Sequence, residues 1–279
     1  MPAVAEHLDE LRGRIERWRN AGGRIGLVPT MGNLHAGHLA LVDVARKRCD
    51  RTVVSIFVNP TQFGPGEDYD SYPRTRDADL AALERAGCDL AWMPTVSGMY
   101  PLDEPFRVAV PDSLTDCLCG RSRPGHFDGV ATVVIRLFNQ VRPDRAVFGE
   151  KDYQQLVIIR RMVRDLALPI VIDGVQTMRE ADGLAMSSRN GYLDAGQREA
   201  APALYQVLSE TAERLSAGES FARLRPEGLA RLQAAGFEPE YLEWRSAEDL
   251  GPPRAGAPSR LFGAARLGRA RLIDNVPVV

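Results

Sequence analysis

Apolar residues follow two alternating patterns over the first 175 positions, and these patterns predict buried strands and amphipathic helices in turn. Short apolar runs predict strands at 24–30, 51–58, 89–93, 145–149 and 169–173. The continuous β-branched run at 51–58 is typical of a strand covered on both faces of a parallel sheet. Apolar residues at helical spacing predict helices at 4–20, 38–49, 76–87, 129–141 and 152–166. This alternation predicts a doubly wound, Rossmann-like α/β fold with a parallel sheet.

The pattern changes after about residue 175, where long apolar runs give way to shorter amphipathic segments. The elements expected there are a polar loop at 179–191, helices at 198–215 and 220–235, and strands near 239–245 and 270–274. Such a mixture predicts a smaller α+β domain. We therefore expect two domains, a Rossmann-like domain over 1–175 and a C-terminal domain over 176–279.

Composition narrows the class of protein. Hydrophobic residues make up 44% of the 279 positions and charged residues 26%, as in ordinary globular proteins. No uncharged apolar stretch approaches the roughly 18 residues of a membrane helix, and acidic residues occupy the start of the chain, so we expect a cytoplasmic protein without a membrane partner. A net charge of −2 argues against a nucleic-acid partner.

The basic residues are almost all arginine: there are 33 Arg and only two Lys, Lys47 and Lys151. A lysine kept against this bias suggests a position that requires a compact ammonium. Lys151 follows an expected strand in a Gly-Glu-Lys-Asp turn, where it suits a phosphate, whereas Lys47 lies in a helix between two arginines and is expected to be solvated. The four cysteines show no CxxC spacing and are expected to be free thiols.

The strongest local signal is the segment Pro-Thr-Met-Gly-Asn-Leu-His-Ala-Gly-His at 29–38, between an expected strand and an expected helix. A helix N-terminus offers unpaired N–H donors, and glycines let a phosphate approach the backbone. His35 and His38 are three residues apart, so in helical geometry both rings project from one face. They would stabilise charge on an α-phosphate; the alternatives are structural histidines or a metal pair, which lacks an evident third ligand.

This HxGH element resembles that of the nucleotidyltransferases and class I aminoacyl-tRNA synthetases, which attack the α-phosphate of ATP and release pyrophosphate. Three further segments, FVNPTQFG at 57–64, FGEKDYQQ at 148–155 and READGLAMSSRN at 179–190, resemble the pantoate–β-alanine ligase family. Similar segments at 72–75, 123–134 and 270–275 extend the resemblance over nearly the whole chain.

The resemblance implies an ATP-dependent ligase of the HxGH nucleotidyltransferase type, which joins pantoate to β-alanine through a pantoyl adenylate and releases AMP and diphosphate. It also implies Mg²⁺ with the ATP and a homodimer. The implied catalytic residues are His35, His38 and Lys151. The implied ATP-binding residues are Met31, Gly32, Asn33, Leu34, His35, Ala36, Gly37, His38, Gly149, Glu150, Lys151, Asp152, Met178, Met186, Ser187, Ser188 and Arg189. For pantoate and β-alanine they are Gln62, Gln155, Asn59 and Met31, and no protein metal site is implied.

The chemistry of several residues suits these roles. Gln62 follows a buried strand and offers a neutral donor and acceptor, and Gln155, one turn after Lys151, is expected to face the same cleft. The segment 186–189 resembles the KMSKS loop of the wider superfamily but lacks both lysines, so Lys151 and Arg189 must supply the cations. Asp152 suits a ribose, Mg²⁺ or N-cap contact.

Three other functions would leave different signals. A nucleotidyltransferase acting on a phosphate acceptor would need further cations in place of the two glutamines. A tRNA synthetase would need a basic extension, which neither the length nor the charge provides. A dehydrogenase-like module would carry a GxGxxG turn, and this sequence has none.

Overall fold

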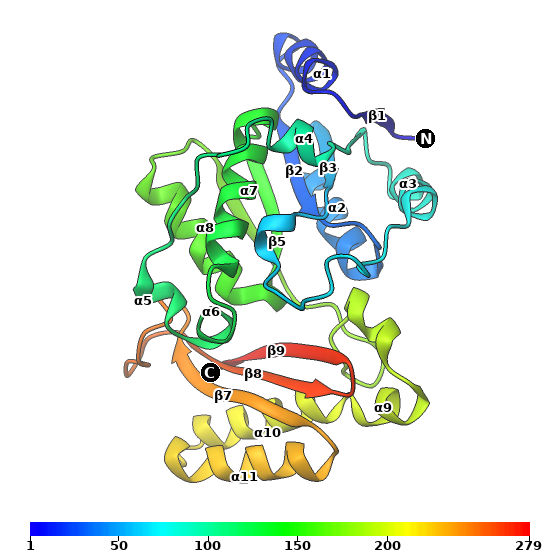
Figure 1. Cartoon of the computed structure of the whole chain (residues 1–279). Helices are drawn as coiled ribbons and strands as arrows, with labels where there is room; N and C mark the ends of the chain where they lie inside the picture. Colours follow the sequence, from blue (N-terminus) through cyan, green and yellow to red (C-terminus); the bar gives the residue numbers. More distant parts are fainter. The chain divides into compact units, whose positions relative to one another are not determined.

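The computed structural model describes all residues, 1–279, and the chain divides into two compact units (Figure 1). The first unit consists of Met1–Val110, Pro124–Glu150 and Ile158–Gln176, and the second of Pro111–Arg123, Lys151–Val157 and Thr177–Val279. The boundary between Gln176 and Thr177 lies next to the domain boundary after residue 175 that the sequence predicts. The segments Pro111–Arg123 and Lys151–Val157 precede this boundary but also belong to the second unit. The apolar pattern of the sequence did not predict this.

The first unit is built on a six-stranded sheet in which every pairing is parallel. Its strands are β1 (Ala3–Ala5), β2 (Ile25–Thr30), β3 (Arg51–Ile56), β4 (Leu90–Trp92), β5 (Arg145–Gly149) and β6 (Val171–Val175). The strand order is β1-β4-β3-β2-β5-β6, so the chain runs outward from β2 through β3 and β4, and then restarts on the other side of β2 with β5. This confirms the doubly wound sheet, and the order reverses between β2 and β5, where ligands of such sheets bind at the carboxyl ends of the strands.

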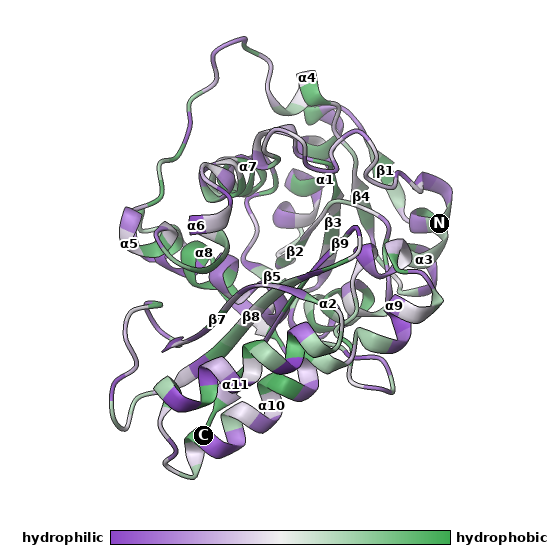
Figure 2. Ribbon diagram, turned by 60° about the horizontal axis from the view of Figure 1, so that its bottom comes forward, coloured by the Kyte–Doolittle hydropathy of each residue, from purple (hydrophilic) through white to green (hydrophobic).

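The helices of this unit pack against the sheet. They are α1 (Leu8–Asn20), α2 (Ala36–Arg48), α3 (Arg76–Arg85), α4 (Val96–Met99), α7 (His126–Val141) and the C-terminal part of α8 (Tyr153–Asp165). Helix α2 packs along β2, β3 and β5, while α7 packs against α1 and β2. The strands that they cover are strongly apolar (Figure 2), as burial on both faces requires. None of the helices combines the length and the apolar content needed to cross a membrane.

The start of the chain differs from the helix expected over 4–20. Residues Ala3–Ala5 form strand β1, which pairs in parallel with β4, with Ala3 opposite Leu90. Helix α1 begins only at Leu8. Pairing at the sheet edge buries Ala5 completely, so tertiary contacts override the helical spacing of these few residues.

The second unit combines a three-stranded antiparallel sheet with helices, which confirms the α+β expectation. Its strands are β7 (Glu238–Ser246), β8 (Ser259–Leu267) and β9 (Ala270–Val278), and its helices are α5 (Asp112–Thr115), α6 (Leu118–Ser122), α9 (Ala195–Ala200), α10 (Ala203–Ser216) and α11 (Phe221–Ala234). The sequence pattern missed β8. The single helix expected at 198–215 is wrong: the chain forms α9 and α10, and Pro202 caps the start of α10 because proline fits the first positions of a helix better than its interior.

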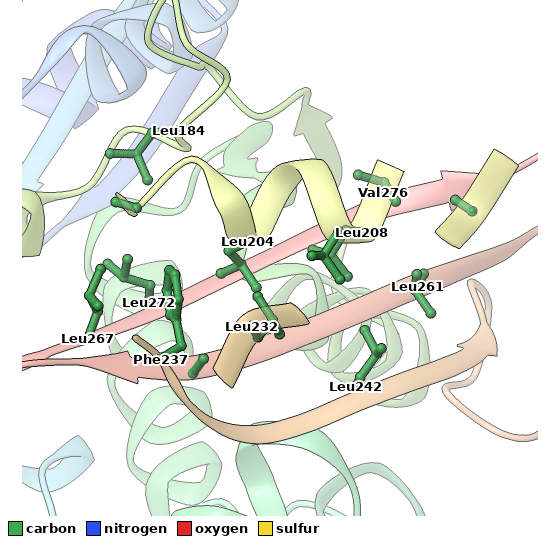
Figure 3. Close-up of a cluster of buried hydrophobic side chains, with 14 of the residues drawn as sticks. Leu184, Leu204, Leu208, Leu232, Phe237, Leu242, Leu261, Leu267, Leu272 and Val276 are labelled. Atoms are coloured by element: carbon green, nitrogen blue, oxygen red, sulfur yellow. The ribbon is translucent and has the colours of Figure 1, made fainter. Parts of the chain in front are cut away.

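The core of this sheet faces α10 and α11. Figure 3 shows Leu204 and Leu208 of α10 with Leu232 of α11 and Leu261 of β8 in one apolar cluster. Gly263 on β8 lets α10 approach closely, because a Cβ there would lie 3.1 Å from Leu204 and 3.3 Å from Leu208. This packing supports β9, which carries Asp274 and Asn275.

Candidate active site

The turn that follows β2 has an unusual backbone that one distant carboxylate stabilises. Gly32 and Asn33 both have positive φ, 85° and 51°. Asp79 on α3 is 2% exposed, and its two oxygens accept hydrogen bonds from Asn33 N at 3.0 Å and Leu34 N at 2.8 Å. A Cβ at position 32 would lie 3.0 Å from Asp79 Oδ2, so the turn requires glycine there. Sequence analysis missed the part played by Asp79, because its partners lie more than forty positions away in the chain.

The two histidines of the HxGH element lie together at the start of α2. His35 is the N-cap residue: its Nδ1 accepts a hydrogen bond from Gly37 N at 3.1 Å, and His38 Nδ1 accepts one from His35 N at 3.3 Å. The ring centroids are 4.1 Å apart, but His35 precedes the helix with an extended backbone, so the rings do not meet through the helical geometry expected from the spacing. Because both Nδ1 atoms are acceptors, a neutral ring carries its proton on Nε2. Helix α2 begins at Ala36, two residues before the expected start.

Three of the predicted substrate-binding residues are in contact: Met31 follows β2, and Asn59 and Gln62 follow β3. Gln62 Nε2 donates to Met31 Sδ at 3.0 Å, and Asn59 Nδ2 donates to Gln62 Oε1 at 3.1 Å. Asn59 caps the 3-10 turn Pro60–Gln62 and is 1% exposed. The imidazole Nδ1 of His126 lies 2.7 Å from the carbonyl oxygen of Gln62. The segments after β2 and β3 therefore present a thioether and two amides together, and the imidazole of His126 at the start of α7 lies beside them.

The position of Asn59 is fixed by partners that the sequence did not identify. Tyr100 Oη donates to Asn59 Oδ1 at 2.8 Å, and Asn59 Nδ2 also donates to the carbonyl oxygen of Gly129 at 3.2 Å. Gly129 lies in α7, and a Cβ there would be 2.1 Å from the carbonyl oxygen of Thr61. This close approach joins α7 to the turn that carries the predicted substrate-binding amides.

In the second unit, Lys151 contacts the backbone of the loop that resembles KMSKS. Its Nζ donates to the carbonyl oxygen of Met186 at 3.1 Å, and its own carbonyl accepts from Asn275 Nδ2 at 3.0 Å. Burial lowers the pKa of the Lys151 ammonium, and the negative charges of Asp152 and Asp274 partly oppose this effect. Lys47, by contrast, lies at the surface in an ion pair with Asp43.

The segment around Met186 is an ordered turn. Met186 N donates to the carbonyl of Met178 at 2.9 Å, and Ser187 caps a 3-10 turn, Ser188–Tyr192, by accepting from Arg189 N at 3.2 Å. A small cavity beside the turn is lined in part by Lys151 and Ser187. Cation, hydroxyl and backbone N–H groups thus gather within this unit, a set that suits a diphosphate.

The remaining predicted residues are described by their positions and exposure. In the first unit, Gly149 is the last residue of β5, and Glu150 begins the 3-10 turn that follows it. In the second unit, Asp152 is exposed, Met178 is 43% exposed and Gln155 is partly exposed on α8. No group of three or more His, Cys, Asp or Glu side chains is arranged to hold a metal ion. All four cysteines are free and buried.

The family model described as pantoate-beta-alanine ligase matches residues 3–277. The chain belongs to the pantoate–β-alanine ligase family. Among its relatives, the pantothenate synthetase of Halorhodospira halophila is 58% identical over 271 residues, which cover 95% of each chain. That of Azotobacter vinelandii is 56% identical over 273 residues, 96% of each chain.

Solved structures of the pantoate–β-alanine ligase family share the fold. The enzyme from Thermus thermophilus superposes with a TM-score of 0.93 at 49% identity and covers 99% of both chains. The pantoate-beta-alanine ligase from Francisella tularensis, complexed with beta-gamma ATP and beta-alanine, gives a TM-score of 0.84 at 31% identity and covers 99% of this chain and 98% of its own. The family expected from the sequence motifs is therefore confirmed.

Proposed function

We propose that this chain joins pantoate to β-alanine with consumption of ATP, and that the reaction proceeds through a pantoyl adenylate. A carboxylate is a poor electrophile, so its oxygen first attacks the α-phosphorus of ATP, and the bond to the bridging oxygen breaks to release diphosphate. The amine of β-alanine then attacks the acyl carbon. The acyl–oxygen bond breaks, AMP leaves and the nitrogen loses a proton, which completes an amide without a covalent enzyme intermediate.

The observation that carries this proposal is the paired arrangement of His35 and His38 at the N-terminus of α2. Both rings accept backbone hydrogen bonds at Nδ1, which leaves Nε2–H as the donor of each ring. Two preorganised donors at a helix N-terminus stabilise negative charge that develops on an α-phosphate. The strand order reverses beside the strand that precedes them, which is where doubly wound folds bind nucleotides.

Within the second unit, we assign the β- and γ-phosphates to Lys151 and to the turn 187–189. An ammonium has three N–H donors, and the Met186 carbonyl accepts one of them. Ser187, Ser188 and Arg189 add hydroxyl, backbone N–H and guanidinium donors.

Pantoate is assigned to Gln62, Asn59 and Met31, with Gln155 as a further binding residue for pantoate or β-alanine. Neutral amides bind a hydroxyl and a carboxylate without a tight ion pair, so the carboxylate keeps its nucleophilicity. The Met31 thioether offers an apolar surface for the methyl groups of pantoate. The proposal also includes MgATP as the form of the substrate, a homodimer and a cytoplasmic location.

One exchange experiment tests the function. Pantoate alone should drive Mg²⁺-dependent incorporation of labelled pyrophosphate into ATP when β-alanine is absent. Addition of β-alanine should then yield AMP, and omission of pantoate should abolish both reactions. Formation of ADP, or exchange that requires β-alanine, would contradict the adenylate route.

A further inference from the structure

A largely buried ion pair in the second unit stabilises the segment that leads to Met186. Arg179 donates to Asp274 on β9 through both terminal nitrogens, at 2.6 and 3.0 Å. The two side chains are 20% and 3% exposed. Such a bidentate pair fixes the orientation of both groups as well as their distance.

Arg179 also holds the turn from within. Its Nη1 donates to the carbonyl of Gly183 at 3.0 Å, and its guanidinium lies 3.8 Å from the centre of the Tyr205 ring. Gly183 has a φ of +93°, and a Cβ there would lie 2.5 Å from the same ring. Across the base of the turn, Arg179 forms a β-bridge with Ala185, the residue before Met186. The guanidinium therefore sets the position of the Met186 carbonyl relative to β9.

The residue after Asp274 sets the position of Lys151. Asp274 Oδ1 accepts from Asn275 N at 2.8 Å, and Asn275 Nδ2 donates to the carbonyl of Lys151 at 3.0 Å. Lys151 Nζ donates a hydrogen bond to the carbonyl of Met186. Asp274 thus acts on the acceptor side of this bond, through Arg179, and Asn275 acts on the donor side, through the Lys151 backbone. Neither of these β9 side chains was assigned a role from the sequence.

We propose that the Arg179–Asp274 ion pair, together with Asn275, positions Lys151 and the turn 187–189 to receive the β- and γ-phosphates of ATP. These are positioning residues, and their assignment rests on the proposed function. A buried ion pair contributes little to stability compared with apolar side chains of similar size. A role in positioning accounts for the pair, because Arg179 lies at the start of the segment that leads to Met186 and Asp274 lies on β9, next to the Asn275 that binds Lys151.

The test replaces the pair by uncharged side chains and compares the binding of ATP with that of AMP. The double variant Arg179→Met with Asp274→Asn removes both charges and keeps an acceptor for Asn275 N. AMP lacks the phosphates in question. We expect ATP affinity, measured by calorimetry, to fall by at least about tenfold while AMP affinity stays within about twofold of the wild type, because misplacement by 1 Å has large effects in preorganised sites.

A matched control comes from the first unit. Arg145 and Asp173 form a similar bidentate pair, at 2.8 Å for both hydrogen bonds, with side chains that are 27% and 6% exposed. Asp173 also pairs with Arg48, so this control removes one ion pair more than the test variant does. Arg145→Met with Asp173→Asn should lower the unfolding temperature by a similar amount and leave the ratio of ATP to AMP affinity unchanged.

A second variant provides a test that does not depend on the folding of the double variant. Asn275→Ser removes the hydrogen bond to Lys151 and the one that Asn275 Oδ1 accepts from Arg260, leaves the ion pair in place and should produce a smaller loss that is again confined to ATP. The proposal is overturned if ATP and AMP affinities fall by the same factor, or if the folded variants bind ATP like the wild type. The proposed function fails separately, if the wild-type chain shows no pantoate-dependent pyrophosphate exchange.

Discussion

The side chain of Asp79 accepts a hydrogen bond from the backbone N–H of Asn33 at 3.0 Å, across 46 positions of sequence. The same carboxylate accepts from Leu34 N, so one buried side chain satisfies two N–H groups in a turn of positive φ. The turn leads directly into His35 and His38. The geometry of the HxGH element thus depends on a residue outside it.

Asp79→Asn should disturb the turn more than the fold. An amide keeps one acceptor but turns an N–H₂ group toward backbone N–H donors, and the loss of a charged hydrogen bond costs about 1.5–3 kcal/mol. We expect pyrophosphate exchange to fall by about tenfold or more, because the histidine donors lose their alignment. Initial exchange rates, measured on protein shown to be folded by circular dichroism, check this.

Asp89→Asn is the control for Asp79→Asn. Asp89 also accepts from a backbone N–H, that of Thr52 at 2.9 Å, but it does so at the amino end of β3. Its replacement should cost similar stability and leave exchange within about threefold. Equal losses of exchange in the two folded variants would show that Asp79 has no special effect on the turn.

His38→Ala should suppress pyrophosphate exchange by roughly a hundredfold or more, the effect of removing one preorganised transition-state donor. His7 provides the matched control, since it is the exposed N-cap residue of α1 and makes no capping hydrogen bond through its side chain. His7→Ala should be silent. If His38→Ala slowed only the transfer to β-alanine and left exchange intact, the assigned role of the pair would be wrong.

Lys151→Arg should fold normally and lose at least about tenfold in turnover, because a planar guanidinium cannot reproduce the compact ammonium that lies, partly buried, beside the Met186 carbonyl. Lys47→Arg changes the chain's other lysine, whose side chain is 71% exposed and pairs with Asp43. That substitution should be nearly silent in steady-state assays. Small and equal effects of the two substitutions would remove the inference drawn from the scarcity of lysine.

The lowered pKa of Lys151 predicts a pH dependence of ATP binding. Burial disfavours the ammonium, so the free enzyme loses this proton below the ordinary value of 10.5. Because phosphate binds the charged form, the KM for ATP should rise as pH increases through the lowered pKa. In the same range, ATP binding should take up a proton, which calorimetry in buffers of different ionisation enthalpy detects. A KM that stays constant up to pH 10.5, without proton uptake, would contradict this.

Replacement of all four cysteines by alanine or serine should leave ligase activity within a few-fold. All four thiols are buried, and burial raises the pKa of Cys88 to about 12, so it carries almost no thiolate at neutral pH. The cost should appear in thermal unfolding, because Cys119 packs against Tyr241 in the second unit. Loss of activity in a single folded cysteine variant would reveal a missed nucleophile or ligand.

The sequence predicted those parts of the fold that leave a local signal. Strands β2, β3 and β5 are buried on both faces, so their apolar runs are unbroken and their bounds agree with the prediction to within two residues. Strand β8 was missed because Gly263 and the alanines that follow it have low strand propensity. Burial against α10 makes that stretch a strand, and burial of this kind has no local signature.

The residues of the candidate site likewise include some that the sequence predicted and some that it did not. The histidines, Gln62 and Lys151 occupy short motifs at the ends of predicted strands, where chemistry and spacing are both visible in the sequence. Asp79 and Asp274 are ordinary acidic residues in the sequence, and only the folded chain shows that each is buried against a turn. Residues that act by holding others require a knowledge of long-range contacts, which a single sequence does not contain.

The hydrogen bond between Lys151 and Asn275 joins residues 124 positions apart. A ribosome therefore completes Lys151 and the 179–190 turn well before it synthesises the strand that fixes them. Throughout that interval the nascent chain already contains the HxGH element and the Asp79 that supports it. The part of the molecule proposed to hold the outer phosphates of ATP therefore gains its contacts with Asp274 and Asn275 only after β9 has been synthesised.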